Sequence, residues 1–440
     1  MRRGLRDAMA AVCAGVLVWA AVWAPAPDAV AVSRGPGYAF APGARSVAGA
    51  QDTAGARMLQ PGRTYRSALP AHGRLYYRLT LTARDDVYVP VTAVPPRDAA
   101  VAATDGIRVS LQDADGNPCS YSSASFGAGL SPRPVTAAGR RDTGSSLCQS
   151  AAVYYLLVER LDAKNSGSER WDLELAPATE PGLAADGPTT PPRSWDSATP
   201  EPPGGVPRER RGGDGFGSAR PLGQGVWRTR LAPGDTVFYK IPVDWGRRVH
   251  AGAELDATDS GHGYAGGALT LSLLNPARVP VDDVALGYSG TRRAAALAPL
   301  PPVEYTNRYA VPSGQNALRF AGDHYLVVHL GAHLADSFGP GPFGVTLRVR
   351  VDGDAHAGPA YRGHAEPDGL FALSATDSPV AGAGTGDTGD TGDSPGGDPA
   401  MRALAYGGLG AGTALLLWLA AWTLLARRAQ TRASAQKPTA

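Results

Sequence analysis

The sequence predicts an all-β protein made of two tandem jelly-roll-like β-sandwich domains, with one transmembrane helix at the C-terminus. Three observations lead to this prediction. Segments of about five to eight residues alternate apolar and polar side chains between Pro, Gly and Asp turns, as strands with one buried face do. This pattern recurs once along the chain. A long uncharged apolar run lies near the C-terminus.

Residues 1–31 have the features of a secretory signal peptide. Arginines at positions 2, 3 and 6 precede an apolar run at 8–24, and Ala29 and Ala31 form an Ala-x-Ala cleavage pattern. The arginine pair fits a twin-arginine signal only loosely, so the general secretory route and the twin-arginine route both stay open. Either route exports the chain, and residues 32–56 are expected to form a flexible leader.

Two distant segments of the chain match without a gap. Tyr65–Leu81 aligns with Trp227–Val243, and further on Tyr155–Val158 aligns with Tyr325–Val328. Two copies of one domain explain both matches. The predicted order is signal peptide (1–31), flexible leader (32–56), first β-sandwich (57–180), Pro/Gly-rich linker (181–215), second β-sandwich (216–352), Gly/Asp-rich stalk (353–402), transmembrane helix (403–426) and short basic tail (427–440).

The run 403–426 would span about 36 Å as a helix, which is enough to cross a bilayer. Arginines follow it directly, and the positive-inside tendency places the tail 427–440 in the cytoplasm. The predicted location is therefore the cell membrane, with a single pass and extracellular N-terminal domains. Gly408 and Gly412 could let two such helices approach, but glycine is abundant throughout the chain, so the oligomeric state stays open.

Cys119 and Cys148 are expected to form a disulfide, because Cys13 leaves with the signal peptide and two cysteines of an exported chain most simply pair. Closing this loop would stabilise the fold by about 3.5 kcal/mol in the chain-entropy model. In the second copy, the aligned positions hold Val281 and Leu318, so both cysteines are replaced together. We expect these two aliphatic side chains to be buried where the first copy has its bridge.

Asp113, Asp115 and Asn117 alternate around a glycine, as at the start of many calcium loops. A helix-flanked calcium loop needs glycine at its sixth position and glutamate at its twelfth, but these positions hold proline and alanine. The aligned stretch of the second copy, Asn275–Pro280, has no carboxylate. We therefore expect a β-turn, with calcium binding as the alternative.

The stretches Gly73–Leu79 (Gly-x-Leu-Tyr-Tyr-x-Leu), Ile107–Asn117 (Ile-x-Val-Ser-Leu-x-Asp-Ala-Asp-Gly-Asn), Tyr154–Val158 and Trp171–Leu175 (Trp-x-Leu-x-Leu) follow one another in the first copy. This order resembles the bacterial pre-peptidase C-terminal domains, and residues 216–352 resemble them less closely. The resemblance implies a small secreted sandwich used for binding, targeting or folding assistance, with no catalytic residues. It departs from the usual arrangement because no protease domain accompanies the two copies.

No grouping of side chains predicts a catalytic or metal site. His329 and His333 have a spacing that suits zinc on a helix, but residues 325–330 have the pattern of a strand, so these two and His324 are expected at a strand edge or in a loop. The pairs Asp85–Asp86 and Asp282–Asp283 sit among turn residues and are expected to be solvated. Ser289 lacks the spacing of a nucleophile elbow and is expected in a loop.

The composition limits the classes of partner that the protein can bind. A net charge of +2 over 440 residues excludes the broad basic surface of a nucleic-acid binder. Lysine is scarce whereas arginine, alanine and glycine are abundant, which suggests a bacterial source. Tyr121, Trp195 and Trp245 could stack on sugar rings, although burial in the fold explains them more simply. No cofactor is implied.

The predicted function is that of a non-enzymatic, membrane-anchored cell-surface protein that presents two β-sandwich modules for protein or envelope binding. The alternative is an accessory or regulatory subunit of a membrane-associated protease or secretion complex. A surface enzyme with an unfamiliar site is a third hypothesis, for which His324, His329, Asp282 and Asp283 are the first residues to test.

Overall fold

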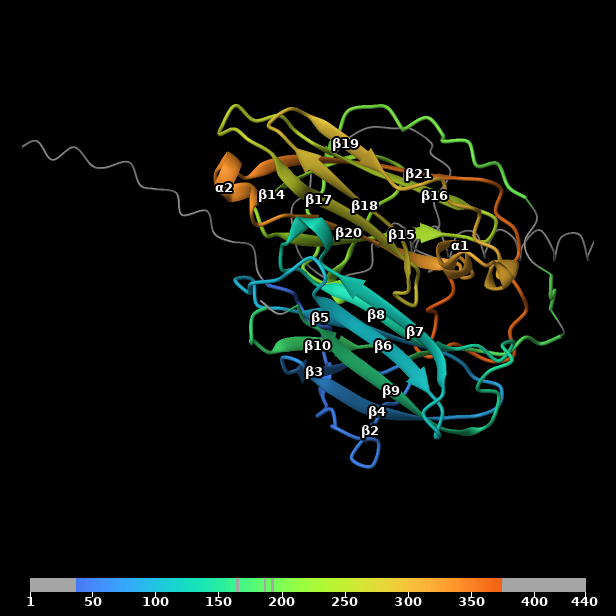
Figure 1. Cartoon of the computed structure of the whole chain (residues 1–440). Helices are drawn as coiled ribbons and strands as arrows, with labels where there is room; N and C mark the ends of the chain where they lie inside the picture. The colour runs from blue at the N-terminus through green and yellow to red at the C-terminus, as the bar shows by residue number, and fades with distance from the viewer. Residues whose placement is uncertain (1–36, 164–165, 186, 191–193, 374–440) are drawn as a thin grey trace, which may run out of the picture. The chain divides into compact units, whose positions relative to one another are not determined.

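The computed structural model describes residues 37–163, 166–185, 187–190 and 194–373 (Figure 1). This part of the chain is all-β, as predicted, and its longest helices have five residues. Within these ranges, no helix has the length and apolar character needed to cross a bilayer. The predicted signal peptide, transmembrane helix and tail, and the stalk after residue 373, lie outside the described residues.

Module 1 is a β-sandwich of two sheets, which we call 1A and 1B. Sheet 1A has the order β1 (Arg45–Ser46), β3 (Tyr65–Leu69), β10 (Trp171–Leu175), β5 (Asp86–Val94), β11 (Ala178–Glu180), with β8 (Val135–Arg141) also paired to β5. Sheet 1B has the order β2 (Arg57–Met58), β4 (Arg74–Leu81), β9 (Ala152–Leu161), β6 (Gly106–Gln112), β7 (Pro118–Ser125). Every second side chain enters the shared core, as Leu75, Tyr77, Leu79 and Leu81 do on β4.

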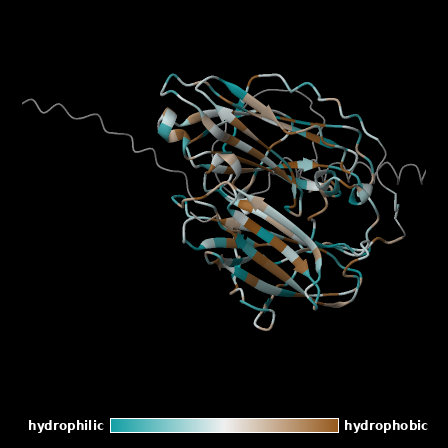
Figure 2. Ribbon diagram, in the orientation of Figure 1, coloured by the Kyte–Doolittle hydropathy of each residue, from teal (hydrophilic) through white to brown (hydrophobic). Residues whose placement is uncertain are grey.

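Module 2 is a second β-sandwich, with sheets 2A and 2B. Sheet 2A has the order β12 (Arg208–Glu209), β14 (Gly225–Leu231), β21 (Phe343–Asp352), β16 (Arg248–Leu255), β19 (Arg293–Ala296). Sheet 2B has the order β13 (Arg220–Pro221), β15 (Thr236–Val243), β20 (Gly322–Leu330), β17 (Ala265–Leu274), β18 (Pro280–Tyr288). Figure 2 shows hydrophobic and hydrophilic bands alternating along the strands of both modules.

The two modules repeat one another strand by strand. The five-strand order of sheet 1B is matched in sheet 2B. In sheet 2A the order of sheet 1A is matched up to β16, where β19 pairs with β16 as β8 pairs with β5, and β11 is an additional strand of sheet 1A. The register also agrees: Tyr76 opposes Leu157 in sheet 1B, and Phe238 opposes Val327 in sheet 2B. The gapless sequence match therefore corresponds to equivalent positions in space.

Short helices occupy the connections. They are η1 (Gly127–Gly129), η2 (Phe216–Ser218), η3 (Tyr305–Tyr309), α1 (Ser313–Ala317) and α2 (Leu334–Phe338). η1 of module 1 lies against β17 of module 2, where a Cβ at Gly129 would lie 3.0 Å from the Gly267 carbonyl oxygen. Gly267 has a φ of +58°, so both the close approach and the backbone conformation favour glycine there.

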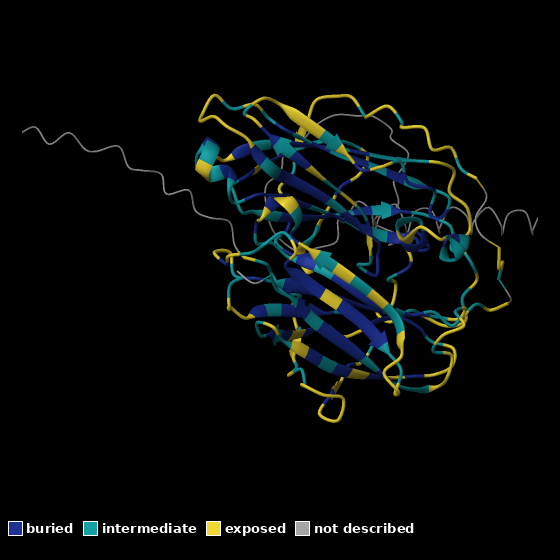
Figure 3. Cartoon of the chain, in the orientation of Figure 1, coloured by how far each residue is buried: buried dark blue, intermediate teal, exposed yellow. Residues whose placement is uncertain are grey.

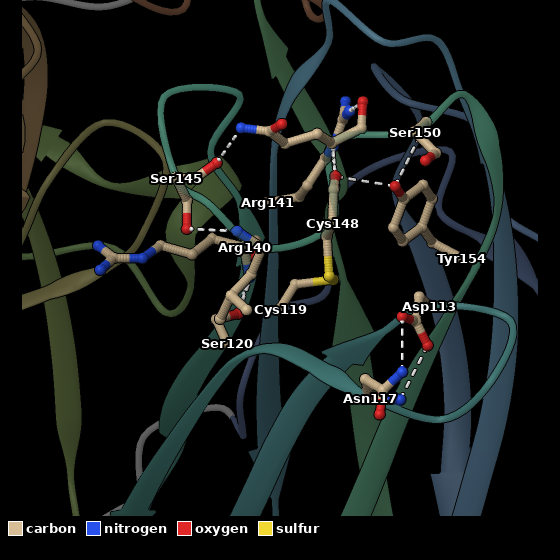
Figure 4. Close-up of a disulfide and its surroundings, with 12 residues drawn as sticks. Asp113, Asn117, Cys119, Ser120, Arg140, Arg141, Ser145, Cys148, Ser150 and Tyr154 are labelled. Carbon is tan, nitrogen blue, oxygen red and sulfur yellow. Dashed lines mark hydrogen bonds between the residues drawn. A yellow bond between two sulfur atoms is a disulfide. The ribbon is translucent and has the colours of Figure 1, made fainter.

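The disulfide between Cys119 and Cys148 is present, with its Cα atoms 5.6 Å apart (Figure 4). Arg141 holds the loop that carries Cys148, because its Nε donates to the Cys148 carbonyl at 2.7 Å and its Nη1 donates to the Thr82 and Asp85 carbonyls. In module 2, Val281 and Leu318 are both buried in the core, as predicted.

The acidic stretch next to Cys119 forms a turn. Asp113 Oδ1 accepts from the amides of Asp115 and Asn117 at 3.0 and 2.8 Å, and Asn117 Nδ2 donates to Oδ2 at 3.0 Å (Figure 4). The bond from Asn117 is the main reason that the pKa of Asp113 is lowered. Module 2 builds the same turn without a carboxylate, since Asn275 Oδ1 accepts from the Val279 amide at 3.0 Å. The turn prediction is confirmed.

Three segments predicted as flexible or extended are bonded to the modules instead. The prediction of a flexible leader is wrong for residues 37–56, because β1 pairs with β3 and the Ala41 amide donates to Glu174. In the linker, the carbonyls of Glu201 and Pro203 accept from arginines of sheet 2A. In the stalk, residues 353–373 return to module 1, where Glu366 pairs with Thr179. Main-chain bonds, which composition does not reveal, hold all three.

Candidate functional site

The outer face of sheet 1A, turned away from the core of module 1, contacts module 2. On β10, the residues on either side of Glu174 enter the core, so Glu174 points outward, and on β5 Tyr88 does the same. Both side chains are nevertheless only 1% exposed. Residues of module 2 therefore cover this face, and buried polar side chains of both modules meet there.

Three carboxylates of module 1 meet two arginines of module 2 at this contact. Arg308 donates from Nη2 to Glu180 Oε1 at 2.5 Å, and its Nη1 lies 3.4 Å from Asp86 Oδ2. Arg319 donates from Nη1 to Asp142 Oδ1 at 2.7 Å. The arginine side chains are 9% and 2% exposed, so the pairs are largely removed from water. We call these five residues the junction cluster.

Neutral polar groups complete the hydrogen bonding of the junction cluster. The Tyr361 hydroxyl donates to Glu180 Oε1 at 3.0 Å, and the Tyr88 hydroxyl lies 3.2 Å from both Asp142 Oδ1 and Glu180 Oε2. Asn316 Oδ1 accepts from Arg319 and, at 2.5 Å, from Arg140 of module 1. Each buried charge thus has partners, as stable burial of an ion pair requires.

Burial changes the acidity of the cluster. Burial raises the pKa of Asp86 and of Glu180, and for Glu180 the charge of Asp86 raises it further against the opposing effect of Arg308. Burial also acts on Asp142, but Arg319 and Arg140 outweigh it and the pKa of Asp142 is lowered. The first two carboxyls therefore hold protons more readily in the folded protein than in the unfolded chain.

A second ion pair lies elsewhere on the contact. Arg278 Nη1 donates to Glu174 Oε1 at 2.6 Å, and the Glu174 side chain is fully covered. The Arg278 guanidinium lies 4.5 Å from the centre of the Phe216 ring. Tyr38 of the leader packs edge-on against Phe238 at 5.7 Å, and burial followed by the Glu174 charge raises the pKa of its hydroxyl. Tyr38 of the leader thus packs into the contact between the two modules.

A third polar link joins Ser131 of module 1 to His329 of module 2. His329 Nε2 is 2.9 Å from Ser131 Oγ, and its Nδ1 is 2.9 Å from Thr236 Oγ1. Ser131 Oγ also accepts from the Ala332 amide at 2.9 Å. Burial, followed by the charge of Arg133, holds the pKa of His329 well below its usual value. A neutral imidazole with both nitrogens bonded has a structural role here.

A cavity of about 340 Å³ opens between the modules beside His329. Its polar lining comes from both modules: Ser123, Arg133 and Thr136 from module 1, and Thr270, Asp282 and Asp283 from module 2. Arg133 donates to the Phe126 and Ser125 carbonyls, and burial lowers its pKa to about 10 although Asp283 opposes the shift. Cavities of about 300–1,000 Å³ hold small molecules, so this one can hold a small polar ligand.

The three predicted histidine candidates do not share a site. His324 and His329 both lie on β20, as the strand pattern predicts, but on opposite faces, since Leu326 and Val328 share the core side with His324. β20 is central between β15 and β17, which corrects the expected strand-edge position. His324 is fully buried, and burial lowers its pKa to about 4. Nowhere in the described ranges do three His, Cys, Asp or Glu side chains form a metal-binding group.

The expectation of solvated turn carboxylates is wrong for Asp86, which is buried, whereas Asp282 is half-buried and Asp283 is exposed, although both lie on a strand and not in a turn. Asp86 begins β5 and is 7% exposed. Asp282 and Asp283 lie on β18, where Asp282 accepts from the Ala298 amide at 2.9 Å. Only Asp85 acts as a turn residue, accepting from the Thr82 amide at 2.7 Å. A strand end next to a second module thus buries Asp86, which its local sequence assigns to a turn.

The remaining candidates are separate from one another. Ser289 is exposed and lies in a loop after β18, as expected. Trp245 is 7% exposed and belongs to the core of module 2, whereas Tyr121 is 78% exposed on β7 of module 1. The predicted aromatic set therefore forms no common platform.

Sequence reasoning missed Arg308, Arg319 and Glu180, which form the junction cluster. One signal was available, because Arg319 lies between two large apolar residues, Leu318 and Phe320. An arginine flanked by two core residues needs a buried partner. The sequence contains nothing that identifies Asp142 as that partner.

No protein-family model and no curated protein sequence matches the chain. Among solved structures, the tandem family 51 carbohydrate-binding modules of a Streptococcus pneumoniae glycoside hydrolase align over 67% of this chain and 85% of theirs, with 6% identity and a TM-score of 0.20. Tripeptidyl peptidase 2 aligns over 69% of this chain and 24% of its own, with 9% identity and a TM-score of 0.20. Scores this low do not establish a common fold, so the activities of these proteins concern them alone.

Proposed function

We propose that this chain is a non-enzymatic cell-surface protein, anchored in the membrane by residues 403–426, that presents two jelly-roll-like modules for binding another envelope or secreted protein. The observation that carries the proposal is the junction between the modules. Its buried ion pairs fix two sandwiches into one platform, and a fixed platform binds a partner without first having to order itself.

The titratable groups first considered for catalysis support the same proposal. Asp86 bonds to Arg308, and His329 bonds to Ser131 and Thr236. Both side chains are engaged in joining the modules, and a general base engaged in this way cannot reach a substrate proton. The disulfide between Cys119 and Cys148 fits an oxidising exterior, where such bonds persist.

The test uses the full-length protein on intact cells. External protease should remove the modules from whole cells and leave the tail 427–440 protected, and crosslinking should recover a defined envelope or secreted protein. Purified protein should contain no stoichiometric transition metal. Protection of the modules from protease would refute the surface location, and a stoichiometric metal would favour the enzyme hypothesis. Recovery of a membrane protease or secretion component whose activity falls on deletion of this chain would favour the accessory-subunit alternative.

A further inference from the structure

The outer face of sheet 1B is the repeat equivalent of a face that module 2 buries. Tyr76 and Leu157 of sheet 1B occupy the register positions of Phe238 and Val327 in sheet 2B. On both sheets these residues alternate with core residues, so they point away from their own sandwich. Module 2 therefore shows how this face packs when other parts of the chain cover it.

In module 2 the face is an interface. Phe238 is 1% exposed and packs against Phe216, with ring centres 5.0 Å apart. At its rim, His329 bonds to Ser131, and Arg278, which lies over the Phe216 ring, bonds to Glu174. An aromatic centre is thus surrounded by polar links to module 1, whose covering surface supplies the carboxylate.

In module 1 the same face carries exposed aromatic and methionine side chains. Tyr121 is 78% exposed and pairs with Ser110, which lies between core residues of β6. Met58 is 38% exposed and its sulfur lies 3.9 Å from Thr80 Oγ1 on β4. Figure 3 shows exposed positions along the strands of sheet 1B. Tyr121 and Met58 lie on the two edge strands of sheet 1B, and half-buried Tyr76 and buried Leu157 lie on the strands between them.

Arginines surround this surface. Arg74 and Arg78 are exposed on β4, and no described carboxylate lies within salt-bridge distance of either. Arg108 on β6 lies 3.8 Å from Glu159, with half of its side chain exposed. Tyrosine, methionine and arginine are the residues enriched where proteins bind one another, and exposed arginines such as Arg74 and Arg78 attract carboxylates.

We propose that the outer face of sheet 1B is the docking surface for a protein partner whose contact surface is apolar with a carboxylate rim. This inference rests on the proposed binding function and names its surface and partner chemistry. The precedent lies inside the molecule, because Phe216 and, from the leader, Tyr38 pack on Phe238 of the equivalent face of module 2, and sheet 1A contributes Glu174 to Arg278 at its rim.

A second copy of the chain does not fit this surface. Sheet 2A is the repeat equivalent of sheet 1A and would be the face to stack on sheet 1B. Its outer side carries Arg348 and Arg350 and is lined by linker residues 199–203, whose carbonyls at Glu201 and Pro203 these arginines bind. The arginines of sheet 2A would then face the arginines of sheet 1B, and linker residues 199–203 would have to move off the outer side of sheet 2A.

The test places a photocrosslinking amino acid at Tyr121 in the full-length protein on intact cells, with Tyr264 of module 2, 72% exposed, as the matched control. We expect a protein adduct from position 121 and none from position 264. The substitutions R74E and R78E together should lower the yield about tenfold or more, whereas R292E with R293E on module 2 should leave it unchanged. Unchanged melting temperatures would show that both pairs leave the fold intact.

Several results would overturn the inference. An adduct from position 264 but not 121 would leave a binding function in place and reject this surface. Adducts from neither position would reject the surface, and their absence from further exposed positions of both modules would reject the binding function itself. An adduct with another copy of this chain would identify self-association. Binding of purified protein to phosphatidylglycerol vesicles, lost in R74E/R78E without any protein adduct, would identify a lipid surface.

Discussion

The Arg319 guanidinium lies 2.7 Å from the Asp142 carboxylate, although 177 residues separate the two along the chain. One belongs to module 2 and the other to module 1, so the pair makes the stability of each module depend on the other. Breaking a buried ion pair by removing one partner costs about 3–5 kcal/mol, because the remaining charge stays buried.

The substitution Arg319→Met should therefore lower the free energy of unfolding by about 3 kcal/mol or more. Calorimetry should also show the single transition of the wild type separating into two as the modules uncouple. Arg292→Met is the matched control, because its pair with Glu254 spans 3.6 Å with 67% of the arginine side chain exposed, and such pairs contribute less than about 1 kcal/mol. Equal losses in both variants would contradict the structural role of Arg319.

Stability should respond to pH through Asp86 and Glu180. Because their folded-state pKa values are raised, the folded protein binds more protons than the unfolded chain above the ordinary carboxyl range. The contribution of these two carboxyls to the free energy of unfolding should thus rise as pH falls from 8 toward 5. The buried His324 and His329, whose folded pKa values are lowered, contribute in the opposite direction. The free energy of unfolding should fall in stronger acid as Asp142, whose folded pKa is lowered by Arg319 and Arg140, becomes protonated.

Glu180→Gln tests this pH dependence directly, since glutamine keeps the shape of the protonated side chain. Between pH 8 and pH 5, the stability of the variant relative to the wild type should fall, because only the wild type gains the contribution of Glu180; urea denaturation at each pH measures the difference. Glu201→Gln, in the exposed linker, serves as the control and should follow the wild-type curve. If the stability of Glu180→Gln changed with pH in parallel with that of the wild type, Glu180 would not be a source of the pH dependence.

Ser131→Ala should cost about 1–3 kcal/mol, because it leaves His329 Nε2 and the Ala332 amide without their partner in a buried site. Chemical denaturation measures the loss. Ser289→Ala removes an exposed hydroxyl and should change stability by less than about 0.5 kcal/mol. A loss below that level for Ser131→Ala would mean that water replaces the hydroxyl.

How far the sequence predicts this molecule depends on the range of each interaction. Strand alternation and the repeat act locally, so Tyr77 and Tyr239, which the repeat aligns, occupy equivalent positions in the two cores. Asp86 was expected in a solvated turn because its neighbours resemble a turn, yet Arg308 lies more than 200 residues away and covers it. The junction depends on how two modules pack, and the composition of a single stretch carries no information about that packing. For the same reason, the linker residues Glu201 and Pro203 resemble a free spacer although arginines of sheet 2A bind their carbonyls.

The repeat also supplies its own control for the disulfide. The double substitution Cys119→Val with Cys148→Leu introduces the residues that module 2 has at the aligned positions. It should lower the free energy of unfolding by about 3.5 kcal/mol, because the unfolded chain regains the conformational entropy that the disulfide loop removes. Cys148→Leu must adopt the left-handed φ of +58° that Cys148 has, whereas Leu318 sits at −86°, so some further loss is expected. Cys119→Ser with Cys148→Ser should cost more, because Cys119 and Cys148 pack against the core and hydroxyls there lose hydration. Urea denaturation of the three proteins ranks them, and a serine pair as stable as the Val/Leu pair would show that the bridge site is not part of the apolar core.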